Sequence, residues 1–192
     1  MERNYILRIS ISEIEPLIWR QVKVNADIHL SELHHVIQLA MGWKNYHLYQ
    51  FSYHDLLMGN PVLLDEKDII SDRFVTLAAI LKKEGDVLGY EYDFGDGWMH
   101  EVRLETITNE ARASHPPVCL NGERNSPPED CGGIGGYYSL LKALTDKRNP
   151  EHKETLQWAG TYNPEKTNLE AINKSFQSIR RYVRKYETEN GL

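Results

Sequence analysis

The stretch that decides the fold of this chain is YDFGDGWMH, residues 92–100. It places three aromatic side chains, two carboxylates, two glycines and an imidazole within nine residues. Glycine accepts the backbone of tight turns, and aromatic residues favour strands. The stretch therefore predicts an antiparallel hairpin with an acidic turn.

The register of this hairpin can be predicted from the spacing of its apolar residues. A three-residue loop at residues 95–97 pairs Tyr92 with His100 and puts Phe94 on the same face, which is apolar apart from the imidazole. A two-residue turn would instead set aromatic rings opposite charged side chains. We therefore expect the three-residue loop, with Asp93 on the opposite face.

The remaining elements of the first half follow from hydrophobic periodicity. Strands are expected at residues 5–11, 18–24, 47–53, 62–64, 88–94 and 98–104, and helices at residues 31–41 and 76–83. Gly42 stands where a left-handed residue ends the main helix. The element order predicts an α+β fold, with a β-grasp-like mixed sheet, an added hairpin strand and a C-terminal helical layer.

We expect one domain over residues 1–192, made of a sheet with one main helix (1–105), a Pro/Gly-rich loop (106–136) and a helical layer (137–192). The first helix of that layer is expected at residues 137–145. A second should open at Asn149-Pro150-Glu151, and a last one should open at Thr167 and Glu170 and run for five turns. Its apolar stripe indicates that it docks on the rest of the chain.

Composition limits the possible functions. The formal charge of −6 and the pI near 5.8 argue against a protein that coats nucleic acid. No apolar run could span a membrane, and no signal peptide precedes the first strand. Two cysteines fit a reducing compartment, so we expect a cytoplasmic protein.

Four motifs together resemble the plasmid pRi ORF-three-like family. They are P-x-I-W-R (16–20), L-H-x-x-I-Q-x-x-M-G-W (33–43), the hairpin stretch (92–100) and P-P-E-D-C-G-G (127–133). Family members occur on plasmids and as transposon passenger proteins, and some carry a TnpR (resolvase) label. The resemblance implies no biochemical activity. Where family members often have a cysteine before Pro-Pro-Glu-Asp, this chain has Ser126.

The resolvase label can be tested against the sequence. A serine recombinase needs a nucleophilic serine in an α/β catalytic domain, and here Ser10 and Ser12 lie on or beside a strand that turns directly into another strand. No separate basic DNA-binding tail follows. The sequence therefore argues against recombinase activity.

Two kinds of metal site are conceivable. A zinc site could use Cys119, Cys131 and either His100 or His115, although the cysteine spacing is not that of a zinc knuckle. The alternative is two small buried cysteines in a packed loop. We predict no cofactor, with a divalent metal as the alternative.

A hard-cation site could support hydrolysis of a phosphodiester. Its candidate catalytic residues are Asp93, Asp96, His100, Glu129 and Asp130. The competing interpretation is structural, because Asp96 suits a turn, the loop carboxylates can bind amides, and His100 lies on the apolar face. The glycines at 132–136 could likewise cradle a phosphate, or they could let the loop pass close to the sheet.

We predict a non-enzymatic binding or accessory module, with a metal-dependent hydrolase acting on nucleic acid as the alternative. The expected partner is a protein or peptide, and DNA could be contacted by a basic set near the C-terminus. That set is Arg180, Arg181, Arg184 and Lys185. The expected binding residues are Trp98, Pro127, Pro128, Glu129, Asp130, Gly132 and Gly133.

In an enzyme the carboxylates and His100 should share one solvent-reached pocket. In a binding module amides and tyrosine hydroxyls should hold the carboxylates.

Overall fold

The computed structural model describes residues 1–64, 68–110 and 116–191. It confirms the α+β class. The described strands form one sheet of order β5-β4-β3-β6-β7-β1-β2-β8, antiparallel throughout except for the β4–β5 pair. The strands are β1 (Glu2–Ile11), β2 (Trp19–Asn25), β3 (Tyr49–Tyr53), β4 (Leu56–Gly59), β5 (Ile70–Ser71), β6 (Val87–Tyr92), β7 (Trp98–Glu110) and β8 (Val118–Glu123).

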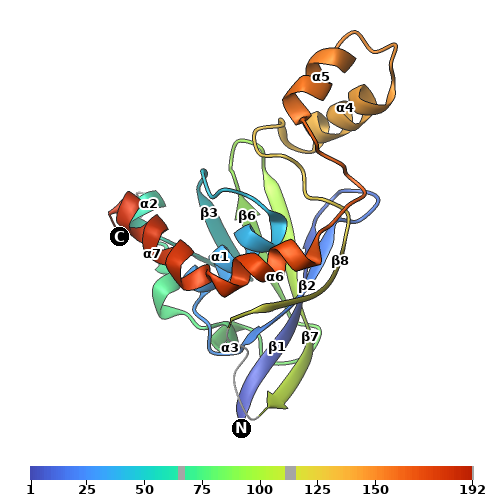
Figure 1. The fold of residues 1–192 in the computed structure, drawn as a ribbon. Helices are drawn as coiled ribbons and strands as arrows, with labels where there is room; N and C mark the ends of the chain where they lie inside the picture. Colours follow the sequence, from blue (N-terminus) through green and yellow to red (C-terminus); the bar gives the residue numbers. More distant parts are fainter. Residues whose placement is uncertain (65–67, 111–115, 192) are drawn as a thin grey trace.

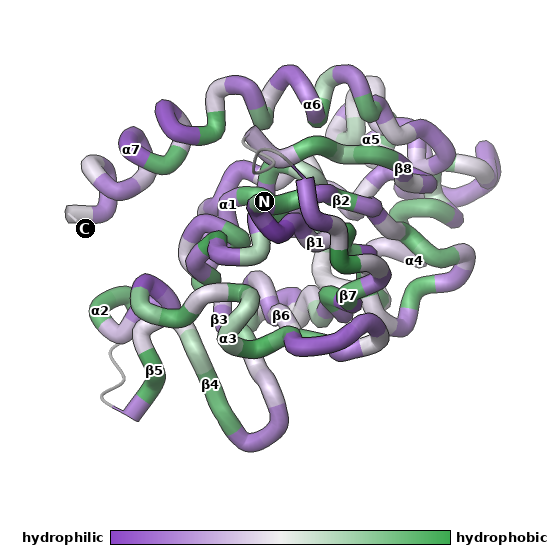
Figure 2. Tube along the Cα trace, turned by 90° about the horizontal axis from the view of Figure 1, so that it is seen from below, coloured by the Kyte–Doolittle hydropathy of each residue, from purple (hydrophilic) through white to green (hydrophobic). Residues whose placement is uncertain are grey.

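The main helices form two layers on one face of the sheet, with α1 next to the strands and α6 and α7 crossing outside it (Figures 1 and 2). The α4–α5 pair stands apart at one end of the sheet (Figure 1). The helices are α1 (Leu30–Met41), α2 (Pro61–Leu64), the 3-10 turn η1 (Asp72–Phe74), α3 (Leu77–Ile80), α4 (Gly133–Thr145), α5 (His152–Ala159), α6 (Leu169–Gln177) and α7 (Ile179–Asn190). In the described parts of the chain, no helix combines the length and the apolar character needed to cross a membrane.

The core lies between the sheet and α1, where the predicted periodicities are confirmed. In β1 every second residue from Tyr5 to Ile11 is fully buried. In α1 the buried stripe includes Leu33, Val36 and Ile37. Gly42 ends the helix at φ 79°, and its N–H donates to the Gln38 carbonyl oxygen.

The hairpin between β6 and β7 has the predicted faces but a different register. Tyr92 pairs with Trp98 and Tyr90 with His100, so the loop spans the five residues 93–97 and the expected pairing is wrong by two positions. A shift of two keeps each side chain within the strands on its face, so Tyr90, Tyr92 and Trp98 stay buried.

Asp93 is the physical reason for the longer loop. It adopts a left-handed backbone at φ 58°, and its Oδ1 accepts hydrogen bonds from the amides of Gly95 (3.0 Å) and Asp96 (3.3 Å). Asp93 therefore leaves the strand and turns inward with 7% of its surface exposed, instead of lying on the outer face. Phe94, expected on the apolar face, is 43% exposed in the turn.

Four other expectations for elements are corrected. Residues 61–64 form the short helix α2 instead of a strand, and the region expected to be a Pro/Gly-rich loop contains the end of β7 and all of β8. α5 begins at His152, two residues after the expected proline. The last helix is two helices, because Ser178 interrupts it.

The last pair of helices docks as predicted. Asn168, and not Thr167, caps α6 by accepting from the Ala171 amide at 3.0 Å. Ile172, Phe176 and Ile179 belong to the same buried cluster as α1. The break at Ser178 therefore leaves the apolar stripe continuous.

Candidate functional site

The segment that carries Pro-Pro-Glu-Asp is fixed at the end of the sheet by hydrogen bonds. The Trp43 indole Nε1 donates to the Pro127 carbonyl oxygen at 2.8 Å. The Glu129 carboxylate accepts from the Tyr92 hydroxyl at 2.6 Å and from the Lys44 amide at 3.0 Å. Each of its oxygens accepts one hydrogen bond, so Glu129 holds the loop against the hairpin and the end of α1.

Asp96 and the glycine run hold the next part of the same segment. The Gly132 amide donates to Asp96 Oδ2 at 3.1 Å. A Cβ at Gly133 would lie 2.5 Å from the Asp96 carbonyl oxygen, and one at Gly136 would overlap the Cys131 carbonyl oxygen. Gly133 therefore allows the loop to pass close to the hairpin, which was one of the two predicted interpretations, and Gly136 allows a tight turn within the loop itself.

His100 is a core residue. It is 2% exposed, its Nδ1 donates to the Trp98 carbonyl oxygen at 2.9 Å, and its ring stands edge-on to Trp43. Burial lowers the pKa of His100 to about 4. Its imidazole does not share a pocket with the carboxylates. Trp98, expected on the binding surface, is 1% exposed and belongs to the same core.

Asp93 and Asp130, both expected site residues, lie together around His47, which the sequence analysis did not single out. His47, in the segment between α1 and β3, has its Nε2 3.1 Å from Asp130 Oδ1 and 3.5 Å from Asp93 Oδ2. The three ligand atoms lie within 4.8 Å of one another. In the chain these residues are far apart, so no spacing motif could have linked them.

The described residues do not bring Cys119, Cys131 and His100 together as a metal site. In the described residues, the groups of three or more potential ligands include neither Cys119 nor Cys131. Burial raises the pKa of their thiols to about 11 and about 12, which disfavours thiolate ligands at neutral pH. Ser126 is buried against Met41, and His115 lies outside the described residues.

Arg20 is a buried cation whose role the sequence analysis did not explain. Its guanidinium is 1% exposed and donates to the carbonyl oxygens of Ala40 (3.0 Å), Trp19 (2.8 Å) and Glu123 (3.0 Å). Burial lowers the pKa of Arg20 to about 10. The side chain joins β2, the end of α1 and the end of β8, just before the Pro-Pro-Glu-Asp segment.

A groove of about 540 Å³ runs along the outer side of this segment. Its lining includes Trp43, Tyr46, Pro127, Pro128, Asp130 and Trp158. Tyr46 is 69% exposed and Trp158 is 54% exposed. A second hollow of about 420 Å³ shares Asp130 and Trp158 with the groove and adds Glu151 and Glu154 from the start of α5.

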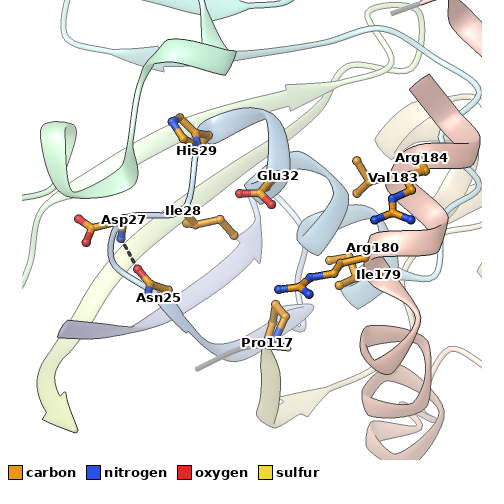
Figure 3. A pocket seen from close by; sticks show the side chains of 10 residues that line it. All are labelled: Asn25, Asp27, Ile28, His29, Glu32, Pro117, Ile179, Arg180, Val183 and Arg184. Atoms are coloured by element: carbon orange, nitrogen blue, oxygen red, sulfur yellow. Dashed lines mark hydrogen bonds between the residues drawn. The ribbon is translucent and has the colours of Figure 1, made fainter. Parts of the chain in front are cut away.

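A separate hollow of about 600 Å³ lies between the start of α1 and α7 (Figure 3). Arg180 and Arg184 extend over it from α7, and Asp27 and Glu32 lie on its other sides (Figure 3). Of the basic set expected to contact DNA, Arg181 and Lys185 do not line this hollow.

The chain is thus an α+β protein in which the β6–β7 hairpin holds the Pro-Pro-Glu-Asp loop through hydrogen bonds of Tyr92 and Asp96. The family model described as "Plasmid pRiA4b ORF-3-like protein" matches residues 3–171, and the chain belongs to this family. It is 37% identical over 179 residues to "Uncharacterized protein y4hQ" of Sinorhizobium fredii, covering 90% of each chain. It is also similar to the crystal structure of the protein of unknown function MM3350 from Methanosarcina mazei Go1. That match has a TM-score of 0.79 and 33% identity, covering 88% of this chain and 97% of the other.

Proposed function

We propose that this protein is a non-enzymatic binding module that takes up a short extended segment of a partner protein in the groove beside Pro127 and Pro128. The observation that carries the proposal is the pair of exposed aromatic rings, Tyr46 and Trp158, on a groove whose wall is fixed by hydrogen bonds. Exposed aromatic rings on a rigid frame provide contact area at low entropic cost.

The charge around the groove favours a basic and apolar segment. Asp130, Glu151 and Glu154 surround Trp158, while Lys44 is the one cation that lines the groove among the described residues. A partner with lysine or arginine next to proline or leucine would meet complementary charge and ring faces. Grooves lined by aromatic rings are also suited to proline-rich segments.

We further propose an accessory role of the mobile-element, transposon-passenger type, carried out in the cytoplasm. The family description, which names a plasmid reading frame, is compatible with such a role. The alternative of a metal-dependent hydrolase on nucleic acid has less support. Glu129 and Asp96 are bound to the loop, and His100 lies in the core. Contact with DNA through Arg180, Arg181, Arg184 and Lys185 stays a prediction. Asp27 and Glu32, which line the hollow beside Arg180 and Arg184, would repel phosphate groups and therefore disfavour it.

A peptide library tests this function. Immobilised ten-residue peptides in matched sets, with Arg/Lys-Pro-Leu or Asp/Glu-Pro-Leu compositions, are probed with the purified protein at 150 mM salt. We expect selective binding of basic sets and at least tenfold weaker binding by Trp158→Ala. The matched control is Phe94→Ala, which removes an exposed ring outside the residues that line the groove.

Two results would contradict the proposal. One is selection of acidic peptides or no selection at all. The other is equal affinity of the wild-type protein and the Trp158→Ala variant for the selected basic peptide.

A further inference from the structure

We propose that His47, Asp93 and Asp130 form a binding site for a first-row divalent cation of the zinc type. The three residues come from separate segments: the connection between α1 and β3, the hairpin turn, and the loop before α4. The proposal goes beyond the peptide-binding function and does not rest on it.

The distances from His47 to the two carboxylates fit the spacing of ligands around such a cation. His47 Nε2 lies 3.1 Å from Asp130 Oδ1 and 3.5 Å from Asp93 Oδ2. Zinc lies about 2.0–2.2 Å from nitrogen and oxygen ligands, which puts neighbouring ligands in a tetrahedral site about 3.4 Å apart. Two of the three spacings match such a site, and all three atoms lie within 4.8 Å of one another.

Asp93 gives an independent indication that a ligand is accommodated here. Its side chain is 10% exposed, and its Oδ1 is occupied by the Gly95 and Asp96 amides. Its Oδ2 faces the imidazole, and among the described residues no donor forms a hydrogen bond to it. Oδ2 is thus a carboxylate oxygen with a position left for a ligand, and a cation there would compensate the negative charge of a largely buried side chain.

Of the three ligand atoms, His47 Nε2 is the one that is buried without a hydrogen bond. Nε2 is shielded from solvent, and its contact with Asp130 lies within hydrogen-bond distance but lacks hydrogen-bond geometry. Within the described parts of the chain the nitrogen thus has no hydrogen-bond partner, and its polar contacts are the two carboxylates. The ring is held edge-on against Tyr92, with ring centroids 5.8 Å apart, so its direction is fixed.

The chemistry of the ligands narrows the choice of cation. Imidazole favours zinc and its neighbours over magnesium or calcium, and two carboxylates are acceptable zinc ligands. The amides that hold Asp93 Oδ1 orient the carboxylate, as outer-shell partners do at metal sites. The Asp130 side chain is 68% exposed and lines the groove, so the remaining coordination positions would open toward solvent on that side.

Isothermal titration of the untagged, metal-free protein with Zn²⁺ tests the site, and Mg²⁺ provides the comparison. We expect one Zn²⁺ per chain, with Mg²⁺ binding at least tenfold more weakly. Asp130→Asn should weaken Zn²⁺ binding at least tenfold. Asparagine keeps the volume of this exposed side chain and tolerates its left-handed backbone at φ 59°, so the variant should fold.

His47→Gln provides a second variant and Asp55→Asn the matched control, because Asp55 is an exposed carboxylate in the β3–β4 turn. His47→Gln should reduce the affinity for Zn²⁺ as Asp130→Asn does, while Asp55→Asn should bind like the wild type. The absence of saturable binding at one Zn²⁺ per chain would overturn the proposal. Wild-type affinity in Asp130→Asn would overturn it as well. No peptide is present, so this result is independent of the groove.

Discussion

At the scale of single residues, Tyr92 links the hairpin to the loop that forms the groove. Its hydroxyl donates to Glu129 Oε1 at 2.6 Å and accepts from the Tyr46 amide at 3.0 Å. Burial, together with the neighbouring Glu129 carboxylate, raises the pKa of this tyrosine, so the hydroxyl keeps its proton at neutral pH. The hydroxyl fixes both sides of the groove at once.

Replacing Tyr92 with phenylalanine should therefore destabilise the protein. The ring would still fill the core, but the Glu129 carboxylate and the Tyr46 amide would each lose a partner. We expect a loss of about 1–3 kcal/mol in the free energy of unfolding, measured by urea denaturation. Tyr46→Phe is the matched control, because that ring is exposed, and it should change the stability by less than about 0.5 kcal/mol. Equal stabilities of the two variants would refute the role of the Tyr92 hydroxyl.

At the scale of elements, α6 covers the outer strand β8 with a side-chain amide. Asn173 Oδ1 accepts from the Cys119 amide at 2.8 Å, and its Nδ2 donates to the Cys119 carbonyl oxygen at 2.9 Å. The side chain thus reproduces the two hydrogen bonds that another strand would supply. α6 is held by this contact as well as by its apolar stripe.

We expect Asn173→Ala to lose both hydrogen bonds and to leave backbone groups of β8 without partners. The expected destabilisation is about 1–3 kcal/mol, with faster aggregation because the strand edge is exposed. Urea denaturation and light scattering measure the two effects. The neighbouring Lys174→Ala is the control, since Lys174 is exposed and its removal should change neither quantity. An Asn173→Ala variant as stable as this control would contradict the expectation.

At the scale of the whole molecule, we expect stability to depend on pH through the three histidines that are buried in the described part of the chain. Burial lowers the pKa of His34 well below its ordinary value, and it lowers those of His35 and His100 to about 4. In the unfolded chain these groups titrate near 6.5. Below that pH the unfolded state binds more protons than the folded state. The contribution of these histidines to the free energy of unfolding is therefore fully present above pH 6.5 and is lost as the pH decreases.

Urea denaturation at pH 7.5 and pH 5.5 measures this dependence above the range where most carboxylates titrate. Each histidine contributes a slope of at most about 1.4 kcal/mol per pH unit below pH 6.5. His100→Gln should reduce the slope, while the exposed His54→Gln should leave it unchanged. Equal stability of the wild type at both pH values would show that the buried histidines do not control it.

Particular residues also explain which parts of the fold and of the candidate site could be predicted from the sequence. The buried faces of the hairpin were predictable because period-two alternation survives a shift of two residues. Its register was not, because the side chain of Asp93 sets the loop through bonds that periodicity does not report. β8 escaped prediction because Cys119 is its one fully buried residue and its sequence shows no alternation. Asp93 and Asp130 were singled out by their motifs, whereas His47 is joined to them by the fold alone.

The protected outer strand has a further consequence for how copies of this protein meet other chains. One border of the sheet is engaged by Asn173 at Cys119, and the other is β5, which has two residues. A strand from another chain that pairs with β8 at Cys119 would have to displace α6. A strand that adds at the other edge would pair with the two residues of β5. We therefore expect association to spare the sheet borders and to use side-chain surfaces at its end, where the aromatic rings and acidic groups lie.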